Sequence, residues 1–279
     1  MTALLLAAAL LIGVSLGLMG GGGSVLAVPA LMYLGGLDAQ EAIATSLFVV
    51  AVTSAVAVVR HARAGCVRGR TGVLFGVSAM AGAYAGGRLA GFVSETVLLV
   101  AFAVMTLAAA VAMIRGRGEG APGAGADVRR LVLYGAGVGL ASGFVGAGGG
   151  FLFVPALVLL GGLPMAQAVG TSLLVITFSS TAALAGQLSA VRLDWGLAIL
   201  VAGVAVAGSL LGSRYAGRLA PDTARRAFGL LVLGVGGLVL LLQLPAAVLH
   251  GLFAGPPLWA ALGAAVMGVA CRLTCRRVG

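Results

Sequence analysis

Two glycine-rich stretches carry the residues of this chain that are best suited to bind a ligand. The first reads MGGGGSVLAVP over residues 19–29, and the second reads VGAGGGFLFVP over residues 145–155. Glycine runs interrupt helices, and a helix that starts after such a break presents N–H groups without helical acceptors. Together with the positive end of the helix dipole, these groups bind anions without a cationic side chain. The two stretches therefore predict a paired anion site.

Neighbouring residues complete this predicted site. Ser24 adds a hydroxyl group, and each stretch ends in a proline that we expect to kink or cap the helix after the break. A Thr-Ser pair follows in each half, where the hydroxyl groups either contact the substrate or bond to carbonyl groups of their own helix. The predicted substrate-binding residues are Gly20, Gly22, Gly23, Ser24, Pro29, Thr45, Ser46, Gly146, Gly148, Gly149, Gly150, Pro155, Thr171 and Ser172.

A second interpretation of the glycines is close packing between membrane helices. It suits many of the 47 glycines of the chain, but it does not explain why a four-glycine run and its later counterpart are each followed by proline at the same spacing. Two arginines, Arg88 and Arg214, are further candidates that either attract the anion or anchor a helix end. Neither a metal nor a cofactor is expected, since the three cysteines and two histidines form no ligand pattern.

The elements that position these residues must lie in a membrane. The chain is 61% hydrophobic and 9% charged, with a mean hydropathy of +1.17, whereas soluble domains carry about 25% charged residues. Apolar runs of bilayer-spanning length recur throughout, so the lipid bilayer is a partner. The net charge of +10 is entirely due to arginine, which clusters between the apolar runs. The positive-inside rule explains this clustering without a nucleic-acid partner.

The chain is an internal duplication with an offset of 126 residues. GLMGGGGSVLAVPALMYLGGL (17–37) aligns without gaps with GFVGAGGGFLFVPALVLLGGL (143–163), and ATSL (44–47) aligns with GTSL (170–173). We expect a first transmembrane repeat at 1–116, a cytoplasmic linker at 117–126, a second repeat at 127–245, and a C-terminal transmembrane segment with a basic tail at 246–279.

Each repeat should contain a glycine-broken helical hairpin followed by three transmembrane helices. The hairpin makes each repeat cross the membrane an odd number of times, so the two copies have inverted topology, as in many transporters. It also brings 15 of the 17 arginines to one side, which predicts an outside N-terminus and a cytoplasmic C-terminus. The expected helices are 3–18, 24–34, 42–61, 71–90 and 95–114 in the first repeat, and 131–145, 150–160, 168–187, 196–215 and 224–243 in the second.

Ionisable residues avoid the centres of these spans. All seven acids fall at span ends or in loops, which argues against a cation transporter and favours an anionic substrate. His61 lies near a span end beside Arg60 and Arg63. It either reaches toward the membrane surface or carries a proton, and we expect the first of these two roles. Gln187 occupies the matching position in the second repeat.

The duplicated motif resembles that of the sulfite exporter TauE/SafE family of membrane permeases. The resemblance covers about residues 5–245 and rests on GFVGAGGGFLFVPAL and AVGTSL in the second repeat, while the first repeat departs from the pattern at Gly21 and Ser24. It implies an all-α polytopic protein that moves small anions such as sulfite, sulfonates or organic acids, and no enzyme activity.

We therefore expect a secondary transporter that moves small anions across the cytoplasmic membrane and binds them at the paired glycine breaks near the midplane of the bilayer. Three alternatives can be weighed against these residues. A passive anion channel on the same scaffold remains open, and so does a scaffold subunit that needs a partner. A membrane enzyme is disfavoured, because the glycine runs lack the lysine of a phosphate-binding loop. The oligomeric state cannot be predicted from these residues.

Overall fold

The computed structural model describes residues 2–21, 23–115, 128–145, 150–188, 191, 193–215 and 221–243 of the chain. The chain divides into two compact units, 1–239 and 240–279, and the first unit contains the predicted site. Within the described ranges the regular structure is entirely helical, as predicted. The expected linker at 117–126 and the C-terminal segment at 246–279 lie outside these ranges.

Ten helices form in the described residues, five in each half of the chain. Every helix boundary lies within three residues of the predicted one, because glycine, proline and charged residues mark the ends of the apolar runs. The helices are α1 (Thr2–Met19), α2 (Ser24–Tyr33), α3 (Ala39–Arg63), α4 (Gly69–Ala90), α5 (Glu95–Arg115), α6 (Val128–Val145), α7 (Gly150–Leu159), α8 (Met165–Gln187), α9 (Trp195–Tyr215) and α10 (Pro221–Gln243).

Among the described residues, α3, α8 and α9 are long and apolar enough to cross a membrane. At about 1.5 Å per residue they are about 32–38 Å long, which exceeds the thickness of a bilayer's hydrocarbon core. Six further helices contain shorter apolar stretches of 10–17 residues. These lengths and compositions fit a protein that crosses the membrane several times.

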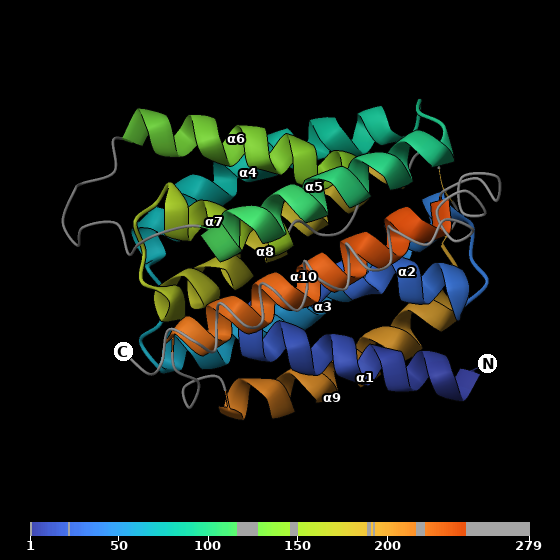
Figure 1. The fold of residues 1–279 in the computed structure, drawn as a ribbon, viewed down its shortest axis with the longest axis horizontal. Coiled ribbons are helices and arrows are strands. Elements are labelled where there is room, and N and C mark those ends of the chain that lie inside the picture. The colour runs from blue at the N-terminus through green and yellow to red at the C-terminus, as the bar shows by residue number, and fades with distance from the viewer. Residues whose placement is uncertain are drawn as a thin grey trace, which may run out of the picture. The chain divides into compact units, whose positions relative to one another are not determined.

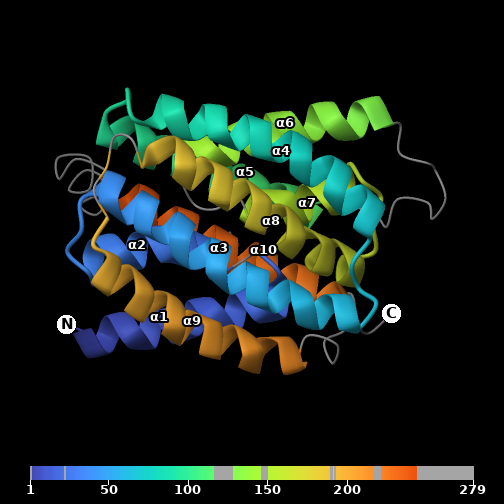
Figure 2. The same ribbon diagram turned by 180° about the vertical axis from the view of Figure 1, so that it is seen from behind.

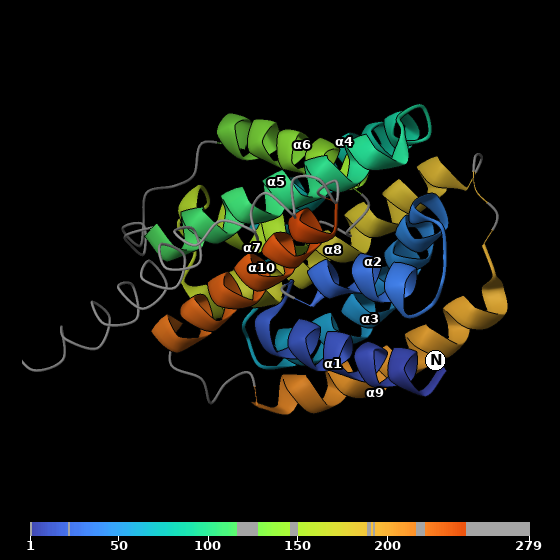
Figure 3. The same ribbon diagram turned by 45° about the vertical axis from the view of Figure 1, so that its right-hand side comes forward.

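In the first half, α2 runs back along α1, as Figure 3 shows. At the start of α2, a Cβ atom placed on Gly23 would overlap the carbonyl oxygen of Ile12. Farther along α2, Leu31 packs in one apolar cluster with Leu5 and Ala9 from the beginning of α1. Since Leu31 lies beside the start of α1 and Gly23 lies nearer its end, the two helices form the predicted hairpin.

Two seams of small residues join the halves of the chain. One lies between α1 and α9 and the other between α4 and α6 (Figures 1 and 2). At each contact a Cβ atom on the glycine would overlap the backbone of the facing helix, so the backbones touch directly. The pairs are Gly13 with Ala205 and Gly17 with Ser209 in the first seam, and Gly139 with Ala79 and Gly143 with Ala83 in the second.

These pairs are related by the duplication. Adding 126 to the α1 residue and subtracting 126 from the α9 residue converts each pair of the first seam into a pair of the second. Helix α1 therefore packs on the other half of the chain, and so does its copy α6. The two halves thus exchange their first helices, since α1 packs on α9 of the second half and α6 packs on α4 of the first.

Aromatic contacts fix the beginning of α7. The ring of Phe151 lies 5.9 Å from that of Phe102 on α5, and the ring of Phe153 lies 6.0 Å from that of Phe75 on α4 in an edge-to-face arrangement. All four side chains are fully buried. Such pairs contribute about 0.5–1.5 kcal/mol each beyond burial. They hold the helix after the second glycine run between two longer helices.

Candidate functional site

Helix α1 ends because Gly20 adopts a left-handed conformation. Its φ is +76°, which costs a residue with a side chain about 1–2 kcal/mol. The Gly20 amide donates to the carbonyl of Leu16 at 2.9 Å and closes the last turn. A Cβ atom here would also lie 2.7 Å from the carbonyl oxygen of Val169 and 2.9 Å from Oγ of Ser172, both on α8. The first break therefore rests against α8 of the other half.

The described residues of the two glycine breaks touch each other. A Cβ atom on Gly150 would lie 2.7 Å from Cα of Gly21 and 2.9 Å from Oγ of Ser24, and one on Gly21 would overlap the carbonyl group of Gly150. All three residues are buried. Residues 129 positions apart in the chain are thus in backbone contact, and the N-terminal ends of α2 and α7 meet. A paired anion site stays a prediction, and it would need two helix starts close together.

The first turn of α2 is partly satisfied by its own backbone. The Ser24 amide donates to the Gly21 carbonyl at 3.3 Å, and the Leu26 amide donates to the Gly23 carbonyl at 3.1 Å. The Ser24 hydroxyl donates to the Gly21 carbonyl as well, at 2.8 Å. This helix end therefore offers an anion fewer free N–H groups than the four of an uncapped helix.

The serines of the two Thr-Ser pairs bond to their own helices. Ser46 on α3 donates to the Ile43 carbonyl and Ser172 on α8 donates to the Val169 carbonyl, both at 2.8 Å. This is the second of the two roles considered above for these hydroxyl groups. Ser172 nevertheless lies at the break, since its Oγ faces Gly20.

The threonines of these pairs have other surroundings. Thr171 Oγ1 accepts the Arg68 amide at 3.0 Å, and its methyl group faces Gly72 at the start of α4. Thr45, its counterpart on α3, is 1% exposed, and its Oγ1 has no partner among the described residues. The structure thus brings Ser172 to the break and directs Thr171 toward the loop between α3 and α4.

Pro29 and Pro155 lie inside α2 and α7, five residues after each helix begins, and do not cap these helices. Capping, one of the two roles expected of them, is therefore wrong, because helical hydrogen bonding resumes on both sides of each proline. A proline has no N–H group, so the carbonyl groups of Val25 and Phe151, four residues earlier, lose their helical donors. Both prolines are buried.

Four predicted residues lie outside the described residues. These are Gly22 in the first break and Gly146, Gly148 and Gly149 in the second. Arg88 and Arg214 are described, and both are exposed in the last turns of α4 and α9. Cations near the C-terminal end of a helix interact favourably with its dipole, which fits the anchoring role.

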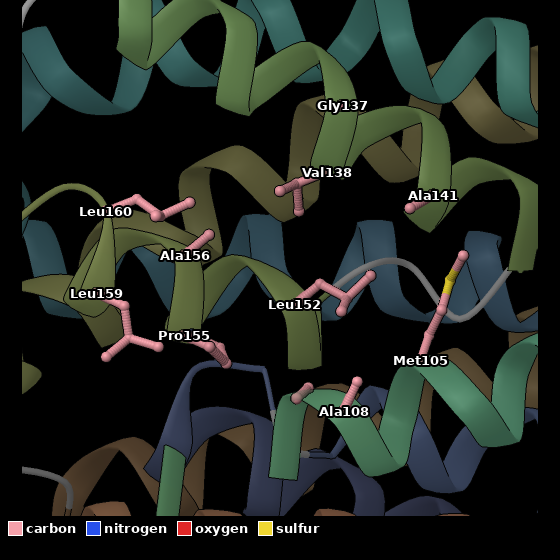
Figure 4. A pocket seen from close by; sticks show the side chains of 11 residues that line it. Met105, Ala108, Gly137, Val138, Ala141, Leu152, Pro155, Ala156, Leu159 and Leu160 are labelled. Carbon is pink, nitrogen blue, oxygen red and sulfur yellow. The ribbon is translucent and has the colours of Figure 1, made fainter. Parts of the chain in front are cut away.

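A cavity of about 390 Å³ lies between α5, α6 and α7 (Figure 4). Figure 4 shows Met105, Val138, Leu152 and Pro155 among the side chains around it. The lining is almost entirely apolar, so it does not suit an anion. The described break residues, Gly20, Gly21 and Gly150, are packed against neighbouring backbone.

His61 is a residue whose environment sequence reasoning missed. It is 6% exposed, and its Nε2 lies 3.0 Å from the carbonyl oxygen of Gly17 in the last turn of α1. The expectation that it reaches the membrane surface was wrong, because α1 packs over this end of α3. The available signal was Gln187, a polar residue at the matching position, which is also buried at 4% exposure.

Acidic side chains lie at the edges of the fold. Asp38 and Asp194 are exposed in loops, and Asp194 accepts the amides of Gly196 and Leu197 at 2.9 and 3.2 Å, capping α9. Among the described residues, no group of three His, Cys, Asp or Glu side chains is arranged to hold a metal ion.

Known proteins resemble this chain over most of its length. The sulfite exporter TauE/SafE family matches residues 5–239. A probable membrane transporter protein of Xylella fastidiosa strain 9a5c is 35% identical over 239 residues, covering 81% of this chain and 89% of that protein. Probable membrane transporter protein MJ0441 of Methanocaldococcus jannaschii is 28% identical over 255 residues, covering 86% and 95%. No solved structure matches the chain.

The family match extends from α1 into α10 and includes both glycine breaks and both seams. The relatives named as transporters cover at least four fifths of the chain. The protein is thus not an enzyme, and it is a helical multi-pass membrane protein. The chain belongs to the sulfite exporter TauE/SafE family of membrane transporters.

Proposed function

We propose that this protein is a secondary transporter that moves small anions, such as sulfite, sulfonates or organic acids, across the cytoplasmic membrane. The observation that carries the proposal is the contact between Gly21 and Gly150, which joins the N-terminal ends of α2 and α7. Two helix dipoles then direct their positive ends toward one place. The backbone N–H groups there, rather than the hydroxyl groups that bond to their own helices, bind the anion.

The directions of the helices support an inverted-topology repeat. Helices α4 and α8 are parallel, because residue numbers at their contacts increase together. Gly72 lies beside Thr171, and Gly87 lies beside Ala183. Helix α4 turns back after the short loop that follows α3 (Figure 2). Helix α8 therefore runs opposite to α3, its own copy in the duplication. We place the N-terminus outside and the arginine-rich loops in the cytoplasm.

The packing of the described break residues supports alternating access over a permanently open pore. The described break residues are buried and in backbone contact, so an anion reaches them only after the breaks separate. Each seam defines one of the two bodies that move against each other. One body contains α1 and α9, and the other contains α4 and α6, so each joins a long helix of one half to the first helix of the other. Rocking of one body against the other opens the breaks to one side at a time.

The test is anion flux in liposomes containing the purified protein, with sulfite, thiosulfate, sulfoacetate and acetate as probes. Gly150→Leu inserts a side chain between the breaks and is expected to reduce flux at least about tenfold, which corresponds to about 1.4 kcal/mol. Gly137→Leu is the matched control, since Gly137 has open space around it. Undiminished flux by a correctly inserted Gly150→Leu variant contradicts the proposed site.

A gradient of the driving ion distinguishes the transporter from a passive channel. Reversing that gradient reverses net transport by a secondary transporter, whereas a channel responds only to the gradient and charge of the anion itself. A wild-type protein that moves none of the four probe anions contradicts the proposed substrate class.

A further inference from the structure

His61 is a buried base in the last turn of α3, beside the end of α1 at the first glycine break. Its Nε2 faces the Gly17 carbonyl oxygen at 3.0 Å, and a carbonyl oxygen only accepts hydrogen bonds, so Nε2 carries the hydrogen. In the neutral imidazole the other nitrogen, Nδ1, then has a free lone pair. A proton added at Nδ1 produces an imidazolium whose Nε2–H group still bonds to the carbonyl of Gly17.

The charged side chains nearest to His61 in the sequence are arginines. On its own helix, the neighbouring Arg60 donates to the Leu210 carbonyl of α9 at 3.4 Å, and Arg63 is exposed. Helix α1 contributes no ionisable side chain. The ionisable residues of α9 are Arg214 and Tyr215, both exposed. In the loop after α3, the Cys66 amide donates to the His61 carbonyl at 3.0 Å.

We propose that His61 carries a proton that is transported together with the anion. The proposal rests on the transport function proposed above and names its coupling ion. The last turn of α1 has the negative end of a helix dipole and stabilises a protonated histidine, while the first turn of α2 has the positive end and stabilises the anion. One glycine break thus separates a site for positive charge from a site for negative charge.

Movement of the break links the two sites. Gly17 lies three residues before Gly20, where α1 ends, so separation of the breaks shifts the carbonyl that holds His61. Once this hydrogen bond opens, the positive charge of the arginines nearby favours release of the proton. Nδ1 takes a proton from water on one side and returns it to water on the other, and no other bond changes.

The second half of the chain sets the stoichiometry. Its residue at the matching position is Gln187, which is 4% exposed and takes up no proton at neutral pH. One proton therefore accompanies each transport cycle. This asymmetry also supplies the substitution for the test, because glutamine is the residue that the protein itself accepts at the equivalent site.

The experiment measures accumulation of thiosulfate and sulfoacetate in liposomes with the membrane potential clamped at zero. An inside-alkaline gradient of one pH unit should make the wild-type protein accumulate the anion about tenfold at equilibrium, since one pH unit corresponds to about 1.4 kcal/mol per proton. His61→Gln should equilibrate the anion without accumulating it. Gln187→Asn, the matched control in the second half, should accumulate it like the wild type.

Different outcomes distinguish the two proposals. If the wild-type protein moves none of the probe anions, the transport function fails. If it moves an anion but does not accumulate it under the pH gradient, or if His61→Gln accumulates it as the wild type does, the role of His61 is overturned. His61→Asn replaces His61→Gln if the latter does not purify as a folded protein, and accumulation by this variant likewise overturns the proposal.

Discussion

In both halves of the chain a long helix ends in a glycine run and a ten-residue helix follows, yet the residues around the two breaks differ. The first half has the Ser24 hydroxyl where the second has Gly150, and it has His61 where the second has Gln187. In the seams that hold the breaks, the glycines of α1 and α6 meet the facing backbone at equivalent positions. The duplication has thus kept the packing of the frame and the Thr-Ser pair, while the residues at positions 24 and 61 differ from their counterparts in the second half.

The comparison shows which residues of the duplicated structure can differ between the two halves and which cannot. A glycine at a backbone contact is costly to replace, because a Cβ atom meets the facing backbone. A side chain beside the break is free to change when its hydrogen bond is local, as for Ser24. Functional asymmetry can therefore arise within one half without disturbing the helix packing of the other.

The largest expected effect comes from Gly20→Ala in the first break. The left-handed φ costs about 1–2 kcal/mol, and overlap with Val169 and Ser172 adds about 1–3 kcal/mol of overpacking. Gly36→Ala is the control, since Gly36 has a φ of +70° and open space around it. Denaturation in detergent should show a clearly larger loss for Gly20→Ala. Equal losses contradict the close approach of the break to α8.

A smaller effect tests the equivalence of the two seams. Gly13→Ala and Gly139→Ala each force a methyl group onto a backbone carbonyl and should lower the free energy of unfolding by about 1–3 kcal/mol. The two losses should agree within about 0.5 kcal/mol, as for independent sites with the same contact. Gly203→Ala, with open space around Gly203, should have no such cost. Unequal losses in the two seams break the symmetry described here.

The smallest effect concerns Ser24. Ser24→Ala removes the 2.8 Å hydrogen bond to the Gly21 carbonyl and should lower the free energy of unfolding by about 1 kcal/mol. Because the hydroxyl hydrogen is already donated, the apparent anion affinity should change by less than about twofold, or about 0.4 kcal/mol. Flux measured against anion concentration checks this, and a tenfold loss of affinity instead makes Ser24 a substrate contact.

Local features of the fold follow from the sequence, and long-range ones do not. The starts of α2 and α7 at Ser24 and Gly150 were predictable because glycine runs end helices. The contact between Gly21 and Gly150 depends on how the two halves interlock, which no local pattern encodes. The same applies to His61, which is buried only because α1 packs over the end of α3.

Equivalent residues show a further limit of sequence reasoning. Thr45 and Thr171 occupy the same place in the repeat, yet Thr171 accepts a backbone amide and Thr45 has no partner among the described residues. The partner of the Thr171 hydroxyl group is the Arg68 amide, which belongs to the loop between α3 and α4. The loop between α3 and α4 differs in sequence from the loop between α8 and α9. The hydrogen-bond partner of each threonine could therefore not be predicted from its place in the repeat.

The exchange of α1 and α6 between the halves also governs the order in which the fold can close during synthesis. Ala79 and Gly139 are 60 residues apart, whereas Gly13 and Ala205 are 192 residues apart. At about 5–20 residues per second, roughly 3–12 s pass between synthesis of the two residues of the first pair, and roughly 10–40 s for the second pair. Two seams that match in space are therefore separated in time. Helix α1 lacks its partner α9 until residues 195–215 have been synthesised.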